Sequence, residues 1–455
     1  MGRVPDRPRD VVPLRESTRA WFLISLQTFG GPAGQIAVMQ RELVDERRWI
    51  GERRFLHALS YCMLLPGPEA QQLAIYTGWL LNGWLGGLVA GVLFVLPGLL
   101  AILALSWVYV AQGDTAVVAG LFLGLAPAVV AIVVQAVARI AGRALKHRAL
   151  VALAVAAFLL LAVLGLPFPL VVLGAGVVGW ALGRWRPTVM ERPAGAEGAD
   201  DGPPPLVPDD ALHRAAPSAR RNLAILGTGL VVWVAPVALA WVLSSGERTV
   251  FTDQGVFFGG MALVTFGGAY AVLSYVAQAA VGTFGWLSAG EMVRGLALAE
   301  TTPGPLIMVV QFVAFLGAYR NPGDLDPWVA AVLGSLLTVW VTFVPCFLFI
   351  FLGAPYVERL RDSKALSAAL TGVTAAVVGV IANLALYFAV HTLFARTRVL
   401  DQGPLALVLP VWSSYVWEAF LVTGLALLLV LRLRWSVLRT LGVCALAGLG
   451  LSLLT

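Results

Sequence analysis

Several apolar runs in this chain are long enough to cross a lipid bilayer. Runs of about 20 residues or more occur at 85–110, 116–138, 328–353 and 405–431, and a helix of about 20 residues spans roughly 30 Å of hydrocarbon. A segment surrounded by lipid must satisfy its own backbone hydrogen bonds, so each run is expected to be a helix. Only 12% of the residues are charged and 59% are hydrophobic, which excludes nucleic-acid-binding proteins and soluble binding modules. The sequence predicts an all-α polytopic membrane protein.

Three marks in the first half of the chain recur in the second half at one displacement of 237 positions. The marks are Gly30-Gly31, Trp49 and Pro66-Gly67-Pro68, which recur as Gly267-Gly268, Trp286 and Pro303-Gly304-Pro305. Further on, Pro97 matches Pro345 and Gly124 matches Gly372 at a displacement of 248. The polar loop at 319–327 accommodates the 11 extra residues of the second half. Self-similarity of this kind is typical of transporters built from internal repeats.

Composition divides the chain between these repeats. The expected parts are an amino-terminal segment at 1–16, a first repeat at 17–185, a flexible linker at 186–221, a connecting transmembrane helix at 222–244 and a second repeat at 255–455. The linker is rich in Pro, Ala, Gly and Asp and lacks hydrophobic periodicity. Six segments and one additional helix precede the second repeat, so that repeat enters the membrane inverted relative to the first.

Loop charges bear on how the chain crosses the membrane. The basic segments are the amino terminus, 41–54, 139–148, the linker, 358–364 and 432–439, whereas 111–114 and 319–327 are neutral or acidic. Thirteen conventional spans would place 41–54 outside. Re-entrant or broken segments at the Gly-Gly and Pro-Gly-Pro marks place every basic segment in the cytoplasm, with Arg396 and Arg398 as external exceptions. The alternative is that four acidic residues in 41–54 dilute its topological signal.

The duplicated glycines and prolines are expected to break helices inside the membrane. Each Pro-Gly-Pro removes two backbone donors and disrupts the local hydrogen-bond ladder. A half-helix that starts at such a break presents N–H groups without partners and a partial positive charge, and can hold a dehydrated anion. Gln35, Gln71 and Gln72 add donors for an oxyanion. The alternative is that the breaks only kink the helices for packing.

Carboxylates within apolar segments suggest proton coupling. Glu69 follows the first Pro-Gly-Pro directly and Glu300 precedes the second by three positions, and a charge at membrane depth usually faces a cavity or a partner. Glu69 could instead act only as a first-turn acid. Glu291 and Arg294, one turn apart, are interpreted as an interfacial pair. No H-E-x-x-H or G-x-S-x-G motif occurs, so we expect no enzyme, no catalytic residues, no metal site and no cofactor.

The runs FGGPAGQIAVMQRELVDERRWI and LLPGPEAQQLAIYTGWLLNG, followed in the second half by FGGAYAVLSYVAQ and ALAETTPGPLIMVVQFVAFLGA, resemble the signature of the chromate ion transporter family. The resemblance extends from Arg19 to the carboxyl terminus except for the linker. The family's motif residues carry over to Gly30, Gly31, Pro32, Pro66, Gly67, Pro68, Glu69, Gln71, Gln72, Gly267, Gly268, Glu300, Thr302, Pro303, Gly304 and Pro305. Ala269 stands where a second proline would be, and Leu306 replaces the acid found at Glu69, so symmetric roles are not assumed.

The resemblance implies a long-chain, two-domain exporter of chromate in the bacterial cytoplasmic membrane, which confers chromate resistance and is driven by a proton or electrical gradient. The expected partners are chromate or a similar oxyanion, the lipid bilayer and a second copy in a homodimer, with the amino terminus in the cytoplasm. Two alternatives stay open: a carrier of sulfate or another oxyanion with the same fold, and a passive anion channel.

Overall fold

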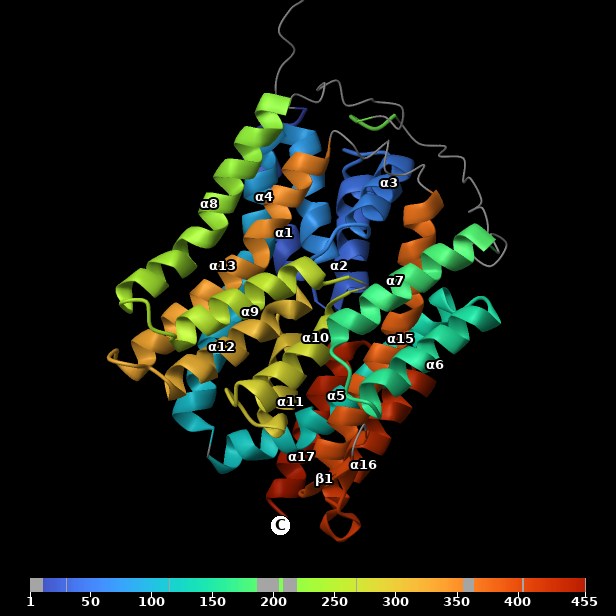
Figure 1. Ribbon diagram of the computed structural model, residues 1–455, viewed down its shortest axis with the longest axis vertical. Helices are drawn as coiled ribbons and strands as arrows, with labels where there is room; N and C mark the ends of the chain where they lie inside the picture. Colours follow the sequence, from blue (N-terminus) through green and yellow to red (C-terminus); the bar gives the residue numbers. More distant parts are fainter. Residues whose placement is uncertain are drawn as a thin grey trace, which may run out of the picture.

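The computed structural model describes residues 11–29, 31–113, 115–185, 204–207, 219–266, 268–354, 364–402 and 405–454. These residues are mostly helical (Figure 1). Six helices in the described part are long and apolar enough to cross a membrane: α4 Glu69–Gln112, α5 Ala116–Ala144, α7 Phe168–Trp185, α8 Ala219–Leu243, α13 Pro327–Gly353 and α15 Lys364–Leu393. The protein is therefore an all-α polytopic membrane protein, as predicted. Gly30, Gly267 and most of the predicted segments 1–16 and 186–221 lie outside the described residues.

The helices of the first half are interrupted at the two expected places. Its other elements are α1 Leu14–Gln27, α2 Gly31–Gln40, the π-helical turn η1 Arg41–Glu46, α3 Glu52–Cys62 and α6 Arg148–Ala162. α1 ends four residues before Gly31, and α3 ends before the Pro-Gly-Pro that precedes α4. The chain therefore starts new helices directly after both marks.

The second half repeats the order of the main helices and inserts a strand pair before its last two helices. It comprises α9 Val250–Val264, α10 Ala269–Ala277, η3 Gln278–Thr283, α11 Ala289–Thr301, η4 Leu306–Met308, α12 Val309–Arg320, α13, α15, β1 Thr397–Gln402, β2 Leu405–Pro410, η6 Trp412–Ser414, α16 Trp417–Leu427, η7 Leu428–Arg432 and α17 Val437–Ser452. The prediction of one helix over 405–431 was wrong at its start, because β1 and β2 pair as an antiparallel hairpin and the helix begins only at Trp417. The apolar residues of β2 alternate poorly with polar ones, so periodicity could not separate this strand from a buried helix.

The long helix α4 is folded back on itself at Asn82 and Gly83, whose backbone is not helical. In a straight helix, Ile75 and Gly91 would lie about 24 Å apart at 1.5 Å per residue. Instead, a Cβ built on Gly91 would lie 2.5 Å from Cγ1 of Ile75. The two parts of α4 therefore run antiparallel in direct contact. In the second half, α12 and α13 form the equivalent hairpin with a longer loop at 321–326, which is where the extra residues were expected.

The two halves pack through reciprocal contacts between small residues. Gly124 on α5 meets Gly448 on α17, where a Cβ on Gly448 would lie 2.5 Å from Cα of Gly124. Its counterpart Gly372 on α15 meets Gly179 on α7 in the same manner, with a corresponding distance of 2.8 Å from Gly179. Glycine allows helix backbones to approach closely, which drives helix association in membranes. Each half therefore supplies the long helix that the last helix of the other half packs against.

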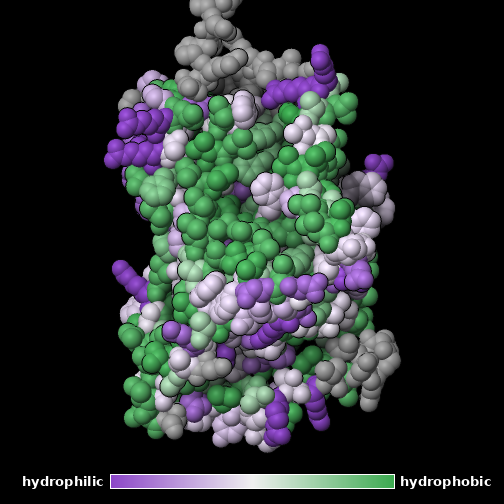
Figure 2. Space-filling view, turned by 90° about the vertical axis from the view of Figure 1, so that its left-hand side faces the viewer, coloured by the Kyte–Doolittle hydropathy of each residue, from purple (hydrophilic) through white to green (hydrophobic). Residues whose placement is uncertain are grey.

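The outer surface fits a lipid environment. Figure 2 shows hydrophobic side chains gathered over the middle of one face, with hydrophilic side chains mostly toward its two ends. The connecting helix α8 has no buried residue, and Figure 1 shows it along the edge of the molecule beside α13 and α9. The protein is therefore a multi-pass membrane protein, and this face carries an apolar surface of the kind that lipid covers.

Candidate functional site

Each Pro-Gly-Pro is hydrogen-bonded to the helix break of the other half. The N–H of Gly67 donates to the carbonyl of Thr265 at 2.8 Å, and the N–H of Gly304 donates to the carbonyl of Thr28 at 3.0 Å. Gly67 and Gly304 are displaced by 237 positions, as are Thr28 and Thr265. The two bonds join each Pro-Gly-Pro to the Gly-Gly break of the other half, and α2 contacts α4 while α10 contacts η4, so the four breaks form one reciprocal crossing.

The backbone at the described breaks takes a conformation that favours glycine. The φ angles of Gly67 and Gly304 are +114° and +103°, in a region that residues with a Cβ rarely enter. Gly31 and Gly268 also have positive φ, at +74° and +99°. Pro68 and Pro305 are the N-cap residues of α4 and η4. Proline is tolerated at a helix start because no intrahelical bond needs its missing N–H. The result is four helix starts whose first amides lack intrahelical partners.

Glu69 points toward the break of the second half. A Cβ built on Gly268 would lie 3.8 Å from Oε1 of Glu69, and Glu69 is partly exposed. It is the first residue of α4, and Pro68 makes no side-chain cap. In the second half, buried Leu306 takes the equivalent position. The carboxylate therefore makes the crossing asymmetric, as the sequence difference at this position indicated.

Glu300 lies at the same break on its other side. Tyr270, on the first turn of α10, donates its hydroxyl to Oε1 of Glu300 at 2.5 Å, and Oε2 has no partner among the described residues. Glu300 is 2% exposed. Glu69 therefore lies against Gly268 and Glu300 is bonded to the first turn of the helix that follows it, so two carboxylates flank the Gly-Gly break of the second half.

The predicted glutamines and threonine take different roles. Gln35 donates to the carbonyl of Gly304 and Gln72 donates to the carbonyl of Pro66 at 2.6 Å, so both brace the Pro-Gly-Pro turns. Thr302 donates to Ala299 on its own helix. Gln71 is fully buried, and neither its amide nitrogen nor its oxygen has a partner in the described structure. A buried amide of this kind is uncommon in native proteins, which makes Gln71 the strongest candidate among these four for a ligand or water contact.

The remaining predicted residues lie directly at the crossing. Gly31 and Pro32 begin α2, and Pro66 and Pro303 precede the two hydrogen-bonded glycines. Pro303 also lies close to α4, where a Cβ on Gly98 would be 2.8 Å from its carbonyl oxygen. Gly30 and Gly267 remain candidates outside the described residues.

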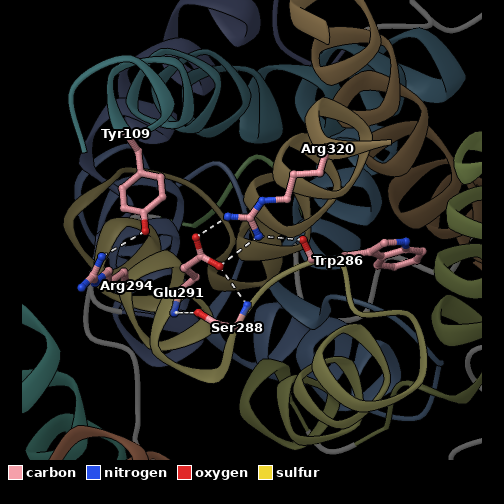
Figure 3. A network of polar contacts seen from close by, with 6 residues as sticks. All are labelled: Tyr109, Trp286, Ser288, Glu291, Arg294 and Arg320. Atoms are coloured by element: carbon pink, nitrogen blue, oxygen red, sulfur yellow. Dashed lines mark hydrogen bonds and ion pairs between the residues drawn. The ribbon is translucent and has the colours of Figure 1, made fainter. Parts of the chain in front are cut away.

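The interfacial pair predicted between Glu291 and Arg294 is wrong. Glu291 is paired with Arg320, which donates to both carboxylate oxygens at 2.6 and 3.0 Å, and it accepts the N–H of Ser288 in a capping box (Figure 3). Arg294 instead donates to the hydroxyl of Tyr109 at 3.2 Å. Because the Ser288 cap turns the carboxylate back over the helix start, it cannot reach one turn forward.

This network lies at the polar start of α11. Burial opposes ionisation of Glu291, but the hydrogen bonds from Arg320 and Ser288 outweigh burial and hold its pKa below the usual value. The pair fixes the end of α12 against the loop that carries Trp286, whose carbonyl also accepts from Arg320. It acts as a structural clamp away from the crossing.

Sequence reasoning missed two groups at the crossing: the carbonyls of Thr28 and Thr265, and the hydroxyl of Tyr270. The two threonines precede their Gly-Gly pairs at the same displacement as the other marks, so the repeat itself contained that signal. The Tyr270 contact spans 30 positions, so no local pattern could have revealed it.

The arrangement suits an anion and offers no metal centre. In the described residues, no group of three or more His, Cys, Asp or Glu side chains is placed to hold a metal ion. Helix starts supply N–H donors and partial positive charge without a compact cation.

Comparisons with known proteins agree that this chain is similar to chromate transport proteins. The family model described as "Chromate transporter" matches residues 16–180 and 253–449. A "Chromate transport protein" of Pseudomonas aeruginosa is 34% identical over 78% of this chain and 76% of its own length. Another of the same description, from Cupriavidus metallidurans, is 27% identical over 91% of this chain and 92% of its own. No solved structure matches. The match covers both halves, including all four helix breaks, and the chain belongs to the chromate transporter family.

Proposed function

We propose that this protein is a secondary active transporter that exports chromate across the bacterial cytoplasmic membrane and so confers chromate resistance. The observation that carries the proposal is the reciprocal pair of hydrogen bonds from Gly67 to Thr265 and from Gly304 to Thr28. This crossing gathers helix starts from both halves around one position, and family membership supplies chromate as the anion. The amino terminus and the linker are assigned to the cytoplasm because they are basic.

In this proposal the oxyanion is held by backbone amides at the starts of α2, α4, α10 and η4. The residues assigned to it are those named from the sequence, with Gln71 as a side-chain donor. A divalent tetrahedral anion gives up its water shell on entering the membrane, and fixed N–H groups replace part of that shell. Inverted repeats that rock about such a site would expose it alternately to the two sides.

Glu69 and Glu300 are assigned to proton coupling. Two unit charges 4 Å apart interact by roughly 4 kcal/mol at an effective dielectric constant near 20. An ionised Glu69 beside Gly268 would therefore oppose a dianion at the same break. Protonation removes this repulsion and adds a donor, so the anion and a proton would move together. Tyr270 positions Glu300 through the hydrogen bond from its hydroxyl.

Flux into proteoliposomes tests the substrate and the driving force. We expect reconstituted protein to move chromate, and to respond to an imposed pH gradient at fixed membrane potential. Sulfate moved in preference to chromate would make this chain a carrier of another oxyanion. Flux that follows only the membrane potential would make it a passive channel. No protein-dependent flux of any oxyanion would contradict the proposal.

A further inference from the structure

A groove between α1 and α4 lies on the outer surface, away from the crossing. It has a volume of about 580 Å³ and is lined by Leu14, Arg15, Thr18, Arg19, Phe22 and Leu93. Arg15, Thr18, Arg19 and Phe22 are spaced i, i+3, i+4 and i+7 along α1, so they share one face of the helix. The two arginines stand at one end of this face, and the apolar side chains of Phe22 and Leu93 stand at the other.

The equivalent surface of the second half is covered by the connecting helix α8. The repeat displacements relate Thr18 to Gly255 and Phe22 to Gly259. A Cβ on Gly255 would lie 2.6 Å from Val237 of α8, and one on Gly259 would lie 3.7 Å from the Trp233 ring. In the second half, these two positions therefore form a surface on which an apolar helix packs.

The side of the groove formed by α4 also has a counterpart in the second half that contacts α8. Leu93 is related to Val341 by the displacement of 248, and the indole N–H of Trp233 donates to the carbonyl of Val341 at 2.9 Å. In the first half, no element of the described chain takes the place of α8, and Phe22 is 47% exposed. Because α8 itself has no buried residue, the surface that it covers and the groove in the first half both lie at the outside of the molecule, where lipid is expected.

Two arginines at the groove, Arg15 and Arg19, favour an anionic ligand. Arg15 and Arg19 are exposed, and neither pairs with a carboxylate of the described residues. They lie in the first turns of α1, where the helix dipole disfavours a cation, so helix stability does not explain them. Arginine binds phosphate with two parallel hydrogen bonds. An occupant that fits has an anionic phosphate at one end and acyl chains at the other.

We infer that this groove binds one anionic phospholipid, whose phosphate contacts Arg15 and Arg19 and whose acyl chain lies along Phe22 and Leu93 in the position that α8 takes in the other half. The inference does not depend on the transported substrate. The lipid covers this surface of the first repeat as α8 covers the equivalent surface of the second.

Lipid retention measured by native mass spectrometry tests this site. Purified full-length protein is mixed with phosphatidylglycerol or phosphatidylcholine of the same acyl chains. We expect wild type to retain phosphatidylglycerol in preference, and the double variant Arg15→Gln/Arg19→Gln to retain it about 25-fold less, since each of the two arginines near an anionic lipid adds about a fivefold preference. Arg220→Gln/Arg221→Gln is the matched control, because these arginines also begin a helix but line no part of this groove. It should retain the lipid as wild type does.

A second variant separates the groove from general surface charge. Leu93→Trp keeps both arginines and fills the groove with a ring, as Trp233 does in the other half, and it should also lose the lipid. Equal retention of both lipids by wild type, or equal loss in the two arginine double variants, would overturn the inference. A Phe22→Cys variant that cross-links efficiently between two copies would assign the groove to a dimer instead. Binding of inorganic phosphate through the same arginines without retention of phosphatidylglycerol would likewise exclude the lipid.

Discussion

At the scale of single residues, Glu69 distinguishes the two halves of the crossing. Its counterpart is Leu306, and the carboxylate lies toward Gly268 rather than over its own helix. The sequence predicted both a coupling role and a capping role for this acid. Its position at the break that Glu300 also borders favours the coupling role.

Replacing Glu69 by Gln tests that role. In wild type we expect chromate flux to fall as pH rises, because the ionised carboxylate repels the dianion. The neutral amide cannot ionise, so Glu69→Gln should keep its flux at high pH and show a nearly flat profile. Flux into proteoliposomes between about pH 5 and pH 9 measures this. Glu418→Gln is the control, since Glu418 is also a first-turn acid. A wild-type pH profile in Glu69→Gln would reduce this residue to a helix-start acid.

Glu291 makes a separate prediction about stability. Its pKa in the folded protein is lowered, so the clamp to Arg320 contributes stability above the ordinary carboxyl pKa of about 4.3 and loses it as pH falls through the folded value. Glu291→Gln should lower the melting temperature at pH 7 by about 2 °C, for a partly exposed pair that contributes on the order of 1 kcal/mol. The difference from wild type should shrink at low pH.

Thermal unfolding in detergent from about pH 3 to pH 7 checks this prediction. Arg248→Gln breaks a more exposed pair, whose arginine side chain is 77% exposed, and should change the melting temperature less. A Glu291→Gln deficit that does not depend on pH would contradict the clamp.

At the scale of elements, the breaks in the helices are the features that the sequence predicted best. Proline and glycine act through the backbone alone, so their effect survives any tertiary context. The fold of α4 at Asn82 and Gly83 was not predicted, because the surrounding run is uniformly apolar and Gly83 is only one of several glycines there. The antiparallel return depends on contacts between Gly78, Gly86 and Ala90, which only the folded hairpin brings together.

Leucine at the crossing glycines should abolish transport without preventing membrane insertion. At Gly304 a Cβ would lie 3.2 Å from Cα of Gly98, and at Gly67 it would lie 3.0 Å from the sulfur of Cys346. Both positions also have positive φ, which adds about 1–3 kcal/mol of strain. The measurements are chromate flux and the amount of folded protein in the membrane. Gly442→Leu is the control, because Gly442 has no neighbour within 4 Å. Wild-type flux in both crossing variants would refute the role of the breaks.

The hairpin in α4 makes a cleaner backbone prediction. Gly83 has φ of +64° and nothing within 4 Å of a Cβ, whereas Gly142 also has open space but an ordinary helical backbone. The φ of +64° and ψ of −154° at Gly83 lie in a region that essentially only glycine enters, so Gly83→Ala should destabilise the protein by about 1–3 kcal/mol through backbone strain alone, and Gly142→Ala should be neutral or stabilising. Thermal unfolding of the two variants compares them, and equal melting temperatures would argue against a positive φ at this turn.

At the scale of the whole molecule, the repeat in the sequence predicted which parts correspond, and the structure shows how they meet. The 237-position displacement relates the two hydrogen bonds of the crossing, and the 248-position displacement relates Gly124 to Gly372 at the outer packing contacts. A displacement shows which residues correspond but not whether a residue contacts its own half or the other half. The contacts between halves, at the crossing and at the outer glycines, could therefore not be derived from it. The inverted orientation of the second repeat and a homodimer stay predictions.

The central claim is that a divalent oxyanion binds where the four helix breaks meet. Crystals grown with chromate allow the chromium to be located by its anomalous scattering. The account predicts a peak beside Gly268, between the starts of α4 and α10, which is lost in Gly67→Leu crystals. A strong chromium peak elsewhere in the membrane region, with none at the crossing, would contradict it.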